Sequence, residues 1–139
     1  SLAPGNEMAE LYLTALRAWA APTAAVVDAA WRLALSPNAL TLAPAILSYA
    51  LARNGRVQDA LEVIEACTRC RSGNACSNAM HAASLLVVDR VDAALALLHA
   101  AASAHCGLLP LLLHDPAYTA LRQHPSYLAL HRVVFGAQV

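Results

Sequence analysis

The stretch NGRVQDALEVIEA, residues Asn54–Ala66, returns in altered form as VDRVDAALALLHA, residues Val88–Ala100. Identical or similar residues stand 34 positions apart in the two stretches: Arg56 and Arg90, Ala60 and Ala94, Leu61 and Leu95, Ile64 and Leu98. A fixed period of about 20 to 50 residues indicates that one supersecondary unit is repeated and stacked along the chain. The fold is therefore expected to follow from this repeat.

Each copy of the repeat has the pattern of two helices joined by a tight turn. In the second copy the helices are expected over about residues 42–53 and 56–69. Asn54-Gly55 separates them, because glycine adopts the left-handed conformation of a helix end, and Asp89 replaces that glycine in the third copy. The second helix presents apolar residues on one face: Val57, Ala60, Leu61, Ile64 and Cys67. A helix–turn–helix unit with this period is typical of tetratricopeptide repeats (TPR).

The whole chain, residues 1–139, is interpreted as one all-α domain of the TPR type. About three helix pairs are expected, over residues 7–38, 41–72 and 75–106, followed by a C-terminal helical cap over 108–135. In the third copy, one helix is expected to hold Met80, His81, Ala82 and Leu85. Ala60 and Ala94 are expected where two helices approach closely, because a larger side chain would separate them.

The predicted cap contains two similar phrases, DPAY over residues 115–118 and HPSY over residues 124–127. Each has a proline that can open a helical turn. Two short helices are expected to follow, with Leu121 and then Leu128, Leu130 and Val134 facing inward. They would cover the apolar end of the last repeat.

Charge excludes two classes of function for this segment. Nine arginines balance nine acidic residues and there is no lysine, so neither a nucleic-acid footprint nor a polybasic membrane patch is expected. Two uncharged windows, Leu33–Ala52 and Ala93–Leu113, contain prolines and have helical amphipathic periodicity, which favours buried helices over membrane spans. The opening SLAPGNEM suggests a fragment of a longer chain, so a membrane contact would come only through an upstream segment.

Four cysteines allow three readings: disulfides, free buried thiols or a zinc site. They are Cys67, Cys70, Cys76 and Cys106. The antiparallel helices of one unit bring all four toward the same corner. A first hypothesis bridges the Cys67/Cys70 end to the Cys76/Cys106 corner, although spacing alone does not give the pairing.

Near its beginning the chain has the stretch AELYLTALRAWAAPTAAVVDAAWRLALSPNALTLAPAILSYALARNGR, over residues 9–56. With this stretch it resembles the leading repeat of the TPR portion that follows the winged-helix domain in ToxR-like bacterial transcription regulators, and a similar portion of some bacterial adenylate cyclases. The segment DRVDAALALLHAA looks like the last full repeat, and LHDPAYTALRQHPSYLALHRVV is similar to the family's ending. In that ending, His124 stands where the family usually has aspartate.

The resemblance implies an accessory domain without chemistry of its own, in a bacterial signalling or transcription regulator. Such a domain would receive a signal, bind a protein partner or self-associate. In the membrane-anchored regulators it would lie on the periplasmic side of the inner membrane, and clustered cysteines are compatible with that place. The alternative is a free-standing cytoplasmic TPR adaptor or secretion chaperone that holds an apolar client segment.

The residues themselves point to no catalytic group, cofactor or metal. The six histidines form no H-E-x-x-H motif, the glycines form no phosphate loop, and Glu62 and Glu65 are expected on a solvent-facing helix. A small thiol or metal-dependent enzyme is the weakest alternative, and the protein is predicted not to be an enzyme.

The predicted binding surface is an apolar concave groove formed by the first helix of each copy. Its occupant is expected to be a protein partner, a second copy of the chain, an apolar peptide or a small ligand. High apolar content favours self-association. The groove residues are Met8, Leu11, Ala15, Trp19, Leu42, Ala45, Tyr49, Arg53, Ala79 and Leu86.

Overall fold

The computed structural model describes residues 4–35, 43–69, 75–114 and 116–136, with side chains from residue 9 onward except that of residue 117. Every regular element in these ranges is helical, so the prediction of an all-α helical array with a C-terminal helix is confirmed. The chain divides into two compact units, Ser1–Cys67 and Thr68–Val139. The single domain over residues 1–139 stays a prediction.

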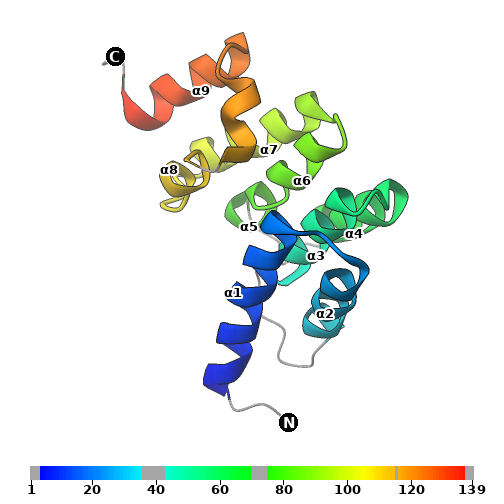
Figure 1. The fold of residues 1–139 in the computed structure, drawn as a ribbon. Helices are drawn as coiled ribbons and strands as arrows, with labels where there is room; N and C mark the ends of the chain where they lie inside the picture. Colours follow the sequence, from blue (N-terminus) through cyan, green and yellow to red (C-terminus); the bar gives the residue numbers. More distant parts are fainter. Residues whose placement is uncertain (1–3, 36–42, 70–74, 115, 137–139) are drawn as a thin grey trace. The chain divides into compact units, whose positions relative to one another are not determined.

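The first unit is built around three mutually packed helices. Its elements are α1 (Pro4–Ala20), α2 (Ala24–Leu35), α3 (Ala43–Arg53) and most of α4 (Val57–Arg69). Helices α1, α2 and α3 contact one another pairwise, as Figure 1 shows. Small residues let these backbones approach closely, and leucines fill the space between them. The buried residues include Leu11, Ala18, Val27, Ala30, Leu47, Ala50 and Leu51.

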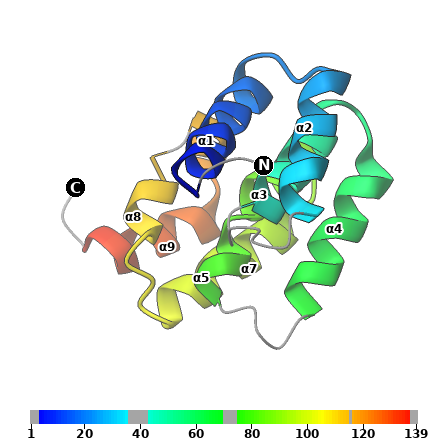
Figure 2. The same cartoon turned by 90° about the horizontal axis from the view of Figure 1, so that it is seen from below.

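The second unit is organised around one central helix, α7 (Val91–Ser103). The others are α5 (Ala75–Ala79), α6 (Ala82–Val87), α8 (Leu109–Leu112), a 3₁₀ helix η1 (Pro116–Leu121) and α9 (Pro125–Phe135). Helix α7 contacts α5, α6, α8 and α9, and Figure 2 shows α8 next to α9. The side chain of Leu98 on α7 is completely buried.

The turn between α3 and α4 ends α3 with a left-handed residue. Gly55 has φ of 80°, and the Arg56 N–H donates to the Leu51 carbonyl oxygen at 2.9 Å. This bond reaches back five residues and satisfies a carbonyl that the helix end would otherwise leave unpaired. Glycine fits the position because it has no Cβ to oppose positive φ.

The turn between α6 and α7 has the same backbone pattern, one repeat later in the chain. Asp89 has φ of 60°, and the Arg90 N–H donates to the Leu85 carbonyl oxygen at 2.8 Å. Asp89 therefore holds the place of Gly55 in the turn. The core beneath the two turns also matches, because Leu51 and Leu85 are both buried.

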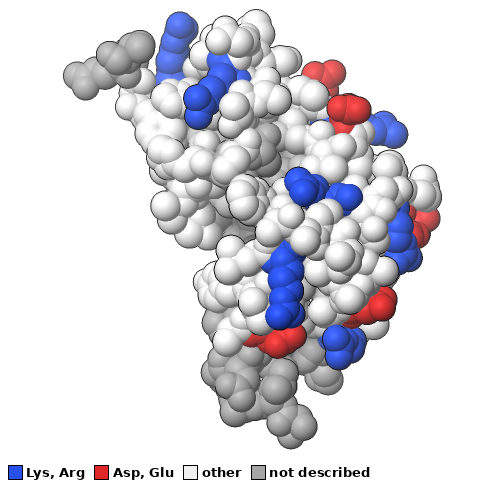
Figure 3. All heavy atoms as spheres, in the orientation of Figure 1, with Lys and Arg blue, Asp and Glu red and all other residues white. Residues whose placement is uncertain are grey.

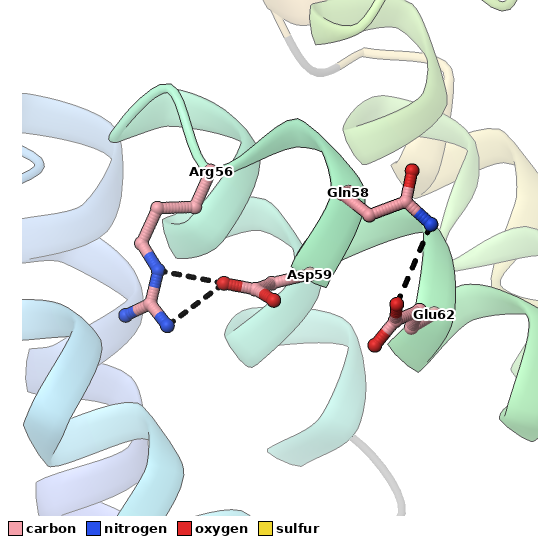
Figure 4. Close-up of polar contacts among 4 residues, drawn as sticks. All are labelled: Arg56, Gln58, Asp59 and Glu62. Atoms are coloured by element: carbon pink, nitrogen blue, oxygen red, sulfur yellow. Dashed lines mark hydrogen bonds and ion pairs between the residues drawn. The ribbon is translucent and has the colours of Figure 1, made fainter.

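The polar face of α4 is exposed to solvent. Figure 4 shows Arg56 paired with Asp59, at 2.8 Å between nitrogen and oxygen, and Gln58 donating to Glu62 at 3.4 Å. Contacts of this spacing on an exposed helix contribute only a few tenths of a kcal/mol each. Glu62 and Glu65 are exposed, as expected.

The predicted single helix through Met80 and His81 is wrong, because the chain breaks there into α5 and α6. The Met80 and His81 N–H groups donate to carbonyls three residues back, those of Ser77 and Asn78, at 3.2 and 3.0 Å. Such i−3 bonds tighten the chain into a 3₁₀-like turn that ends the first helix. His81 is buried at the break, with an exposed fraction of 4%.

The cap follows the sequence prediction in part. Pro116 and Pro125 begin their helices, and Leu121 and Leu130 are buried. The first cap helix is a 3₁₀ helix, and Val134 is half-buried, whereas Leu128 is exposed rather than inward. Asp115 lies outside the described residues.

His124 caps α9. Its Nδ1 accepts a hydrogen bond from the Ser126 N–H at 3.2 Å, which satisfies one of the unpaired donors of the helix start. Ser126 also ties α9 to the central helix, because the His99 Nε2 on α7 lies 2.9 Å from the Ser126 Oγ. The cap is thus joined to α7 by polar contacts as well as by its leucines.

Replacing Ala94 or Ala60 by leucine is expected to lower the free energy of unfolding by about 1–3 kcal/mol, because both side chains are fully buried in packed helices. Urea unfolding followed by circular dichroism measures the change. Ala96→Leu is the matched control for Ala94, since Ala96 is exposed on the same helix and should tolerate the larger side chain. Equal unfolding midpoints for Ala94→Leu and Ala96→Leu would contradict close packing at Ala94.

Candidate functional site

The ten predicted groove residues do not share one environment. Leu11, Ala45 and Ala79 are buried, so these three side chains belong to the core and offer no surface to a ligand. Trp19 and Arg53 are exposed, and Ala15, Tyr49 and Leu86 are half-buried. The Met8 side chain and Leu42 lie outside the described residues. The groove as a whole stays a prediction, because its residues come from both units.

Three of the predicted residues do gather in the first unit, at the end of α1. The Arg53 Nη2 donates to the Trp19 carbonyl oxygen at 3.0 Å, and the Arg53 guanidinium carbon lies 6.0 Å from the centroid of the Tyr49 ring. The first contact satisfies a carbonyl in the last turn of α1, and the second is a cation–π contact. Arg53, one of the predicted groove residues, therefore holds α1 against α3.

Helix α1 presents a large apolar face to solvent. Tyr12, Leu13, Leu16 and Trp19 are 58%, 41%, 65% and 49% exposed, respectively. Tyr12, Leu16 and Trp19 stand at i, i+4 and i+7, so they form one stripe along the helix. This stripe, together with Leu13, is called the α1 face below.

The opposite side of α1 packs into the unit through Leu11, Thr14 and Ala18, at i, i+3 and i+7. Sequence reasoning assigned Leu11 to the binding surface and missed Tyr12, Leu13 and Leu16. The i, i+4, i+7 spacing of Tyr12, Leu16 and Trp19 was the signal that marked the exposed side. An exposed cluster of this composition is unusual on a monomer and is typical of interaction sites.

A disulfide joins Cys76 to Cys106 within the second unit. Their Cα atoms are 5.4 Å apart, although they are 30 residues apart in sequence. The bond connects the start of α5 to the turn that follows α7, which closes the hairpin of the third copy. The hypothesis that this corner bridges to the Cys67/Cys70 end is therefore wrong for Cys76 and Cys106. Cys67 is half-buried on α4, and Cys70 lies outside the described residues.

The turn beside Cys106 explains how it reaches its partner. His105 has φ of 55°, and the Cys106 N–H donates to the Ala101 carbonyl oxygen at 3.0 Å. This is a further turn of the kind seen at Gly55 and Asp89. It reverses the chain at the end of α7 and directs Cys106 back toward α5.

His81 is a titratable ring in the core of the second unit. Burial lowers its pKa from 6.5 to about 4, because the charged imidazolium loses its hydration there. The equivalent residue of the preceding copy is Leu47, which is equally buried. His81 thus occupies a position that the repeat otherwise fills with an apolar side chain.

Among the described side chains, no cluster of three histidine, cysteine, aspartate or glutamate residues could hold a metal ion. Comparison of the chain with protein families, with curated proteins and with solved structures finds no match. In the described ranges, no helix combines the length and apolarity needed to cross a membrane.

Proposed function

We propose that this chain is a non-catalytic interaction domain that binds a second copy of itself through the α1 face. The observation that carries the proposal is the exposure of four large apolar side chains on α1, two of them aromatic. Tyrosine and tryptophan are among the residues most often found at the energetic centres of protein interfaces.

The spacing of the α1 face fits a helix that docks against another apolar helix. Anchors at i, i+4 and i+7, as in Tyr12, Leu16 and Trp19, are the pattern by which amphipathic helices bind apolar surfaces. A second copy presents the same face and can pair with it around a two-fold axis. Because Leu11, Thr14 and Ala18 already anchor the other side of α1, the helix is held in place before it binds.

The larger context that we propose is a sensory segment of a bacterial signalling or transcription regulator, on the periplasmic side of the inner membrane. The sequence resemblance to TPR portions of ToxR-like regulators supports the first part. The Cys76–Cys106 disulfide supports an oxidising compartment, and it favours this reading over a cytoplasmic adaptor. In such a regulator, self-association would couple an external signal to the state of the whole protein.

The test is sedimentation velocity of the chain over a wide concentration range. The unaltered protein is expected to show a reversible dimer. Leu16→Glu places a charge at the centre of the α1 face and should weaken the dimer by about tenfold or more, as expected for the loss of an interface anchor. Circular dichroism checks that the helical content is unchanged.

Leu111→Glu is the matched control. Leu111 is 70% exposed on α8, close to the 65% of Leu16, so the same charge enters a similarly exposed leucine on a helix of the other unit. This variant should dimerise like the unaltered chain. A protein that stays monomeric at every concentration, or equal weakening by both variants, would refute the proposal.

A further inference from the structure

A cavity of about 440 Å³ lies in the second unit, between the end of α8 and one face of α9. Its floor is apolar and largely buried, formed by Leu113 at 7% and Tyr127 at 6% exposure. Phe135 and Leu128 form further walls. The volume is within the range of sites that bind small molecules. It is called the cap pocket below.

A row of four rings lines the cap pocket. The His131 ring lies 4.5 Å from that of Phe135 and 6.3 Å from that of Tyr127, and His114 lies 5.8 Å from Phe135. Tyr127, His131 and Phe135 stand at i, i+4 and i+8, so α9 presents all three on one face. Such a wall offers tilted and offset contacts to another flat ring.

Two guanidinium groups, those of Arg122 and Arg132, border the same pocket. Of the residues that the structure describes, none provides a carboxylate within ion-pair distance of either. Residues 116–139 contain these two arginines and no acidic residue. On the face drawn in Figure 3, the charged side chains seen over α9 are basic. The pocket is therefore apolar inside and positively charged at its edge.

Arg122 lines the same pocket as Tyr127. Burial raises the pKa of Tyr127, and the positive charge of Arg122 partly opposes that rise. Arg132 belongs to α9 itself and directly follows His131 in the sequence. The guanidinium groups of Arg122 and Arg132 therefore both border the pocket that the four rings line.

From this geometry we propose that the cap pocket binds a small aromatic carboxylate. Its ring packs against Phe135 and His131, and its carboxylate lies between the guanidinium groups of Arg122 and Arg132. A carboxylate accepts paired hydrogen bonds from a guanidinium, and the apolar floor takes up the body of the ligand. The site uses no residue of the α1 face, so it does not depend on self-association.

The test uses indole-3-acetate as the probe, its neutral amide indole-3-acetamide, and octanoate as an anion without a ring. Isothermal titration calorimetry of the full chain should give binding of indole-3-acetate at least about tenfold tighter than that of either of the others. Chemical-shift changes on adding the probe should centre on residues 113–114 and 127–136. No detectable binding of indole-3-acetate overturns the proposal, and so does equal or tighter binding of the amide or of octanoate.

Arg122→Gln and Arg132→Gln should each weaken indole-3-acetate binding by about fivefold or more, while leaving amide binding unchanged. Arg90→Gln is the matched control, because Arg90 is exposed in the same unit and does not line the cap pocket. Equal weakening by Arg90→Gln would mean a general charge effect and would overturn the site. The melting temperature of each variant shows whether the fold is kept. If both pocket variants unfold, the comparison of acid with amide on the unaltered chain still decides.

Discussion

Removal of the Cys76–Cys106 disulfide, by the double change Cys76→Ser and Cys106→Ser, is expected to lower the free energy of unfolding by about 3–4 kcal/mol. The bond closes a loop across a sequence separation of 30 residues, and so limits the conformations of the unfolded chain. It also joins the start of α5, a helix of only five residues, to the end of α7. Such a short helix has little stability of its own. Denaturant unfolding of both proteins without reductant measures the difference.

Reductant provides the control for this prediction. Adding dithiothreitol to the unaltered protein should reproduce the stability of the double variant. The same treatment of the double variant should change its free energy of unfolding by less than about 1 kcal/mol, since that variant has no Cys76–Cys106 bond for the reductant to break. If the oxidised and the reduced unaltered protein unfold at the same denaturant concentration, the disulfide does not stabilise this unit.

Acidification is expected to destabilise the protein through His81 by about 3 kcal/mol between pH 6.5 and pH 4. The folded-state pKa of His81 is lowered, so in this window the unfolded chain binds the proton and the folded chain does not. Stability therefore falls as the pH drops below 6.5, and the contribution of His81 is fully lost only below about pH 4. Urea unfolding at a series of pH values measures the effect.

His81→Leu should remove most of this acid sensitivity, because leucine has no titratable group. The fold should accept the change, since the matching position of the second copy is the buried Leu47. His105→Asn is the control: His105 is exposed, and asparagine tolerates its φ of 55°. That variant should lose stability with falling pH as the unaltered protein does. A His81→Leu protein that is as acid-sensitive as the unaltered one would show that another group governs the response.

The sequence predicted those parts of the fold that local chemistry determines. Gly55 and Asp89 marked two turns because a helix end of this kind needs a left-handed residue, and both have positive φ. Ala60 and Ala94 marked buried positions because they lie on the apolar stripe of their helices, and both are fully buried. Pro116 and Pro125 marked helix starts for an equally local reason.

Helix α1 ends differently from the first helices of the other two copies. Its turn to α2 has no left-handed residue among those described; Thr23 caps α2 instead, with its Oγ1 accepting from the Val26 N–H at 3.4 Å. The repeat frame itself holds across the copies, because Leu11, Ala45 and Ala79, which stand 34 residues apart, are all buried. The groove was placed on this face of the repeat, so Leu11 was assigned to the surface and Leu16 was overlooked.

Features that depend on long-range proximity also escaped the sequence. The partner of Cys106 depends on which helix end comes within bonding distance, and four cysteines allow several pairings. The cap pocket combines residues from three separate segments, 113–114, 122 and 127–136. The sequence spacing of these residues does not predict that Arg122 lies beside the rings of α9.

The matching turns at Gly55 and Asp89 have a consequence for the gene. Because the backbone conformation, its hydrogen bonds and the leucine below recur after one repeat period, the chain has the same local geometry before Arg56 and before Arg90. A tandem duplication of the codons between these two points would therefore join ends that already fit, and would lengthen the protein by one repeat period with the junction in a turn. Recombination within the coding region thus offers a direct route to longer descendants of this protein.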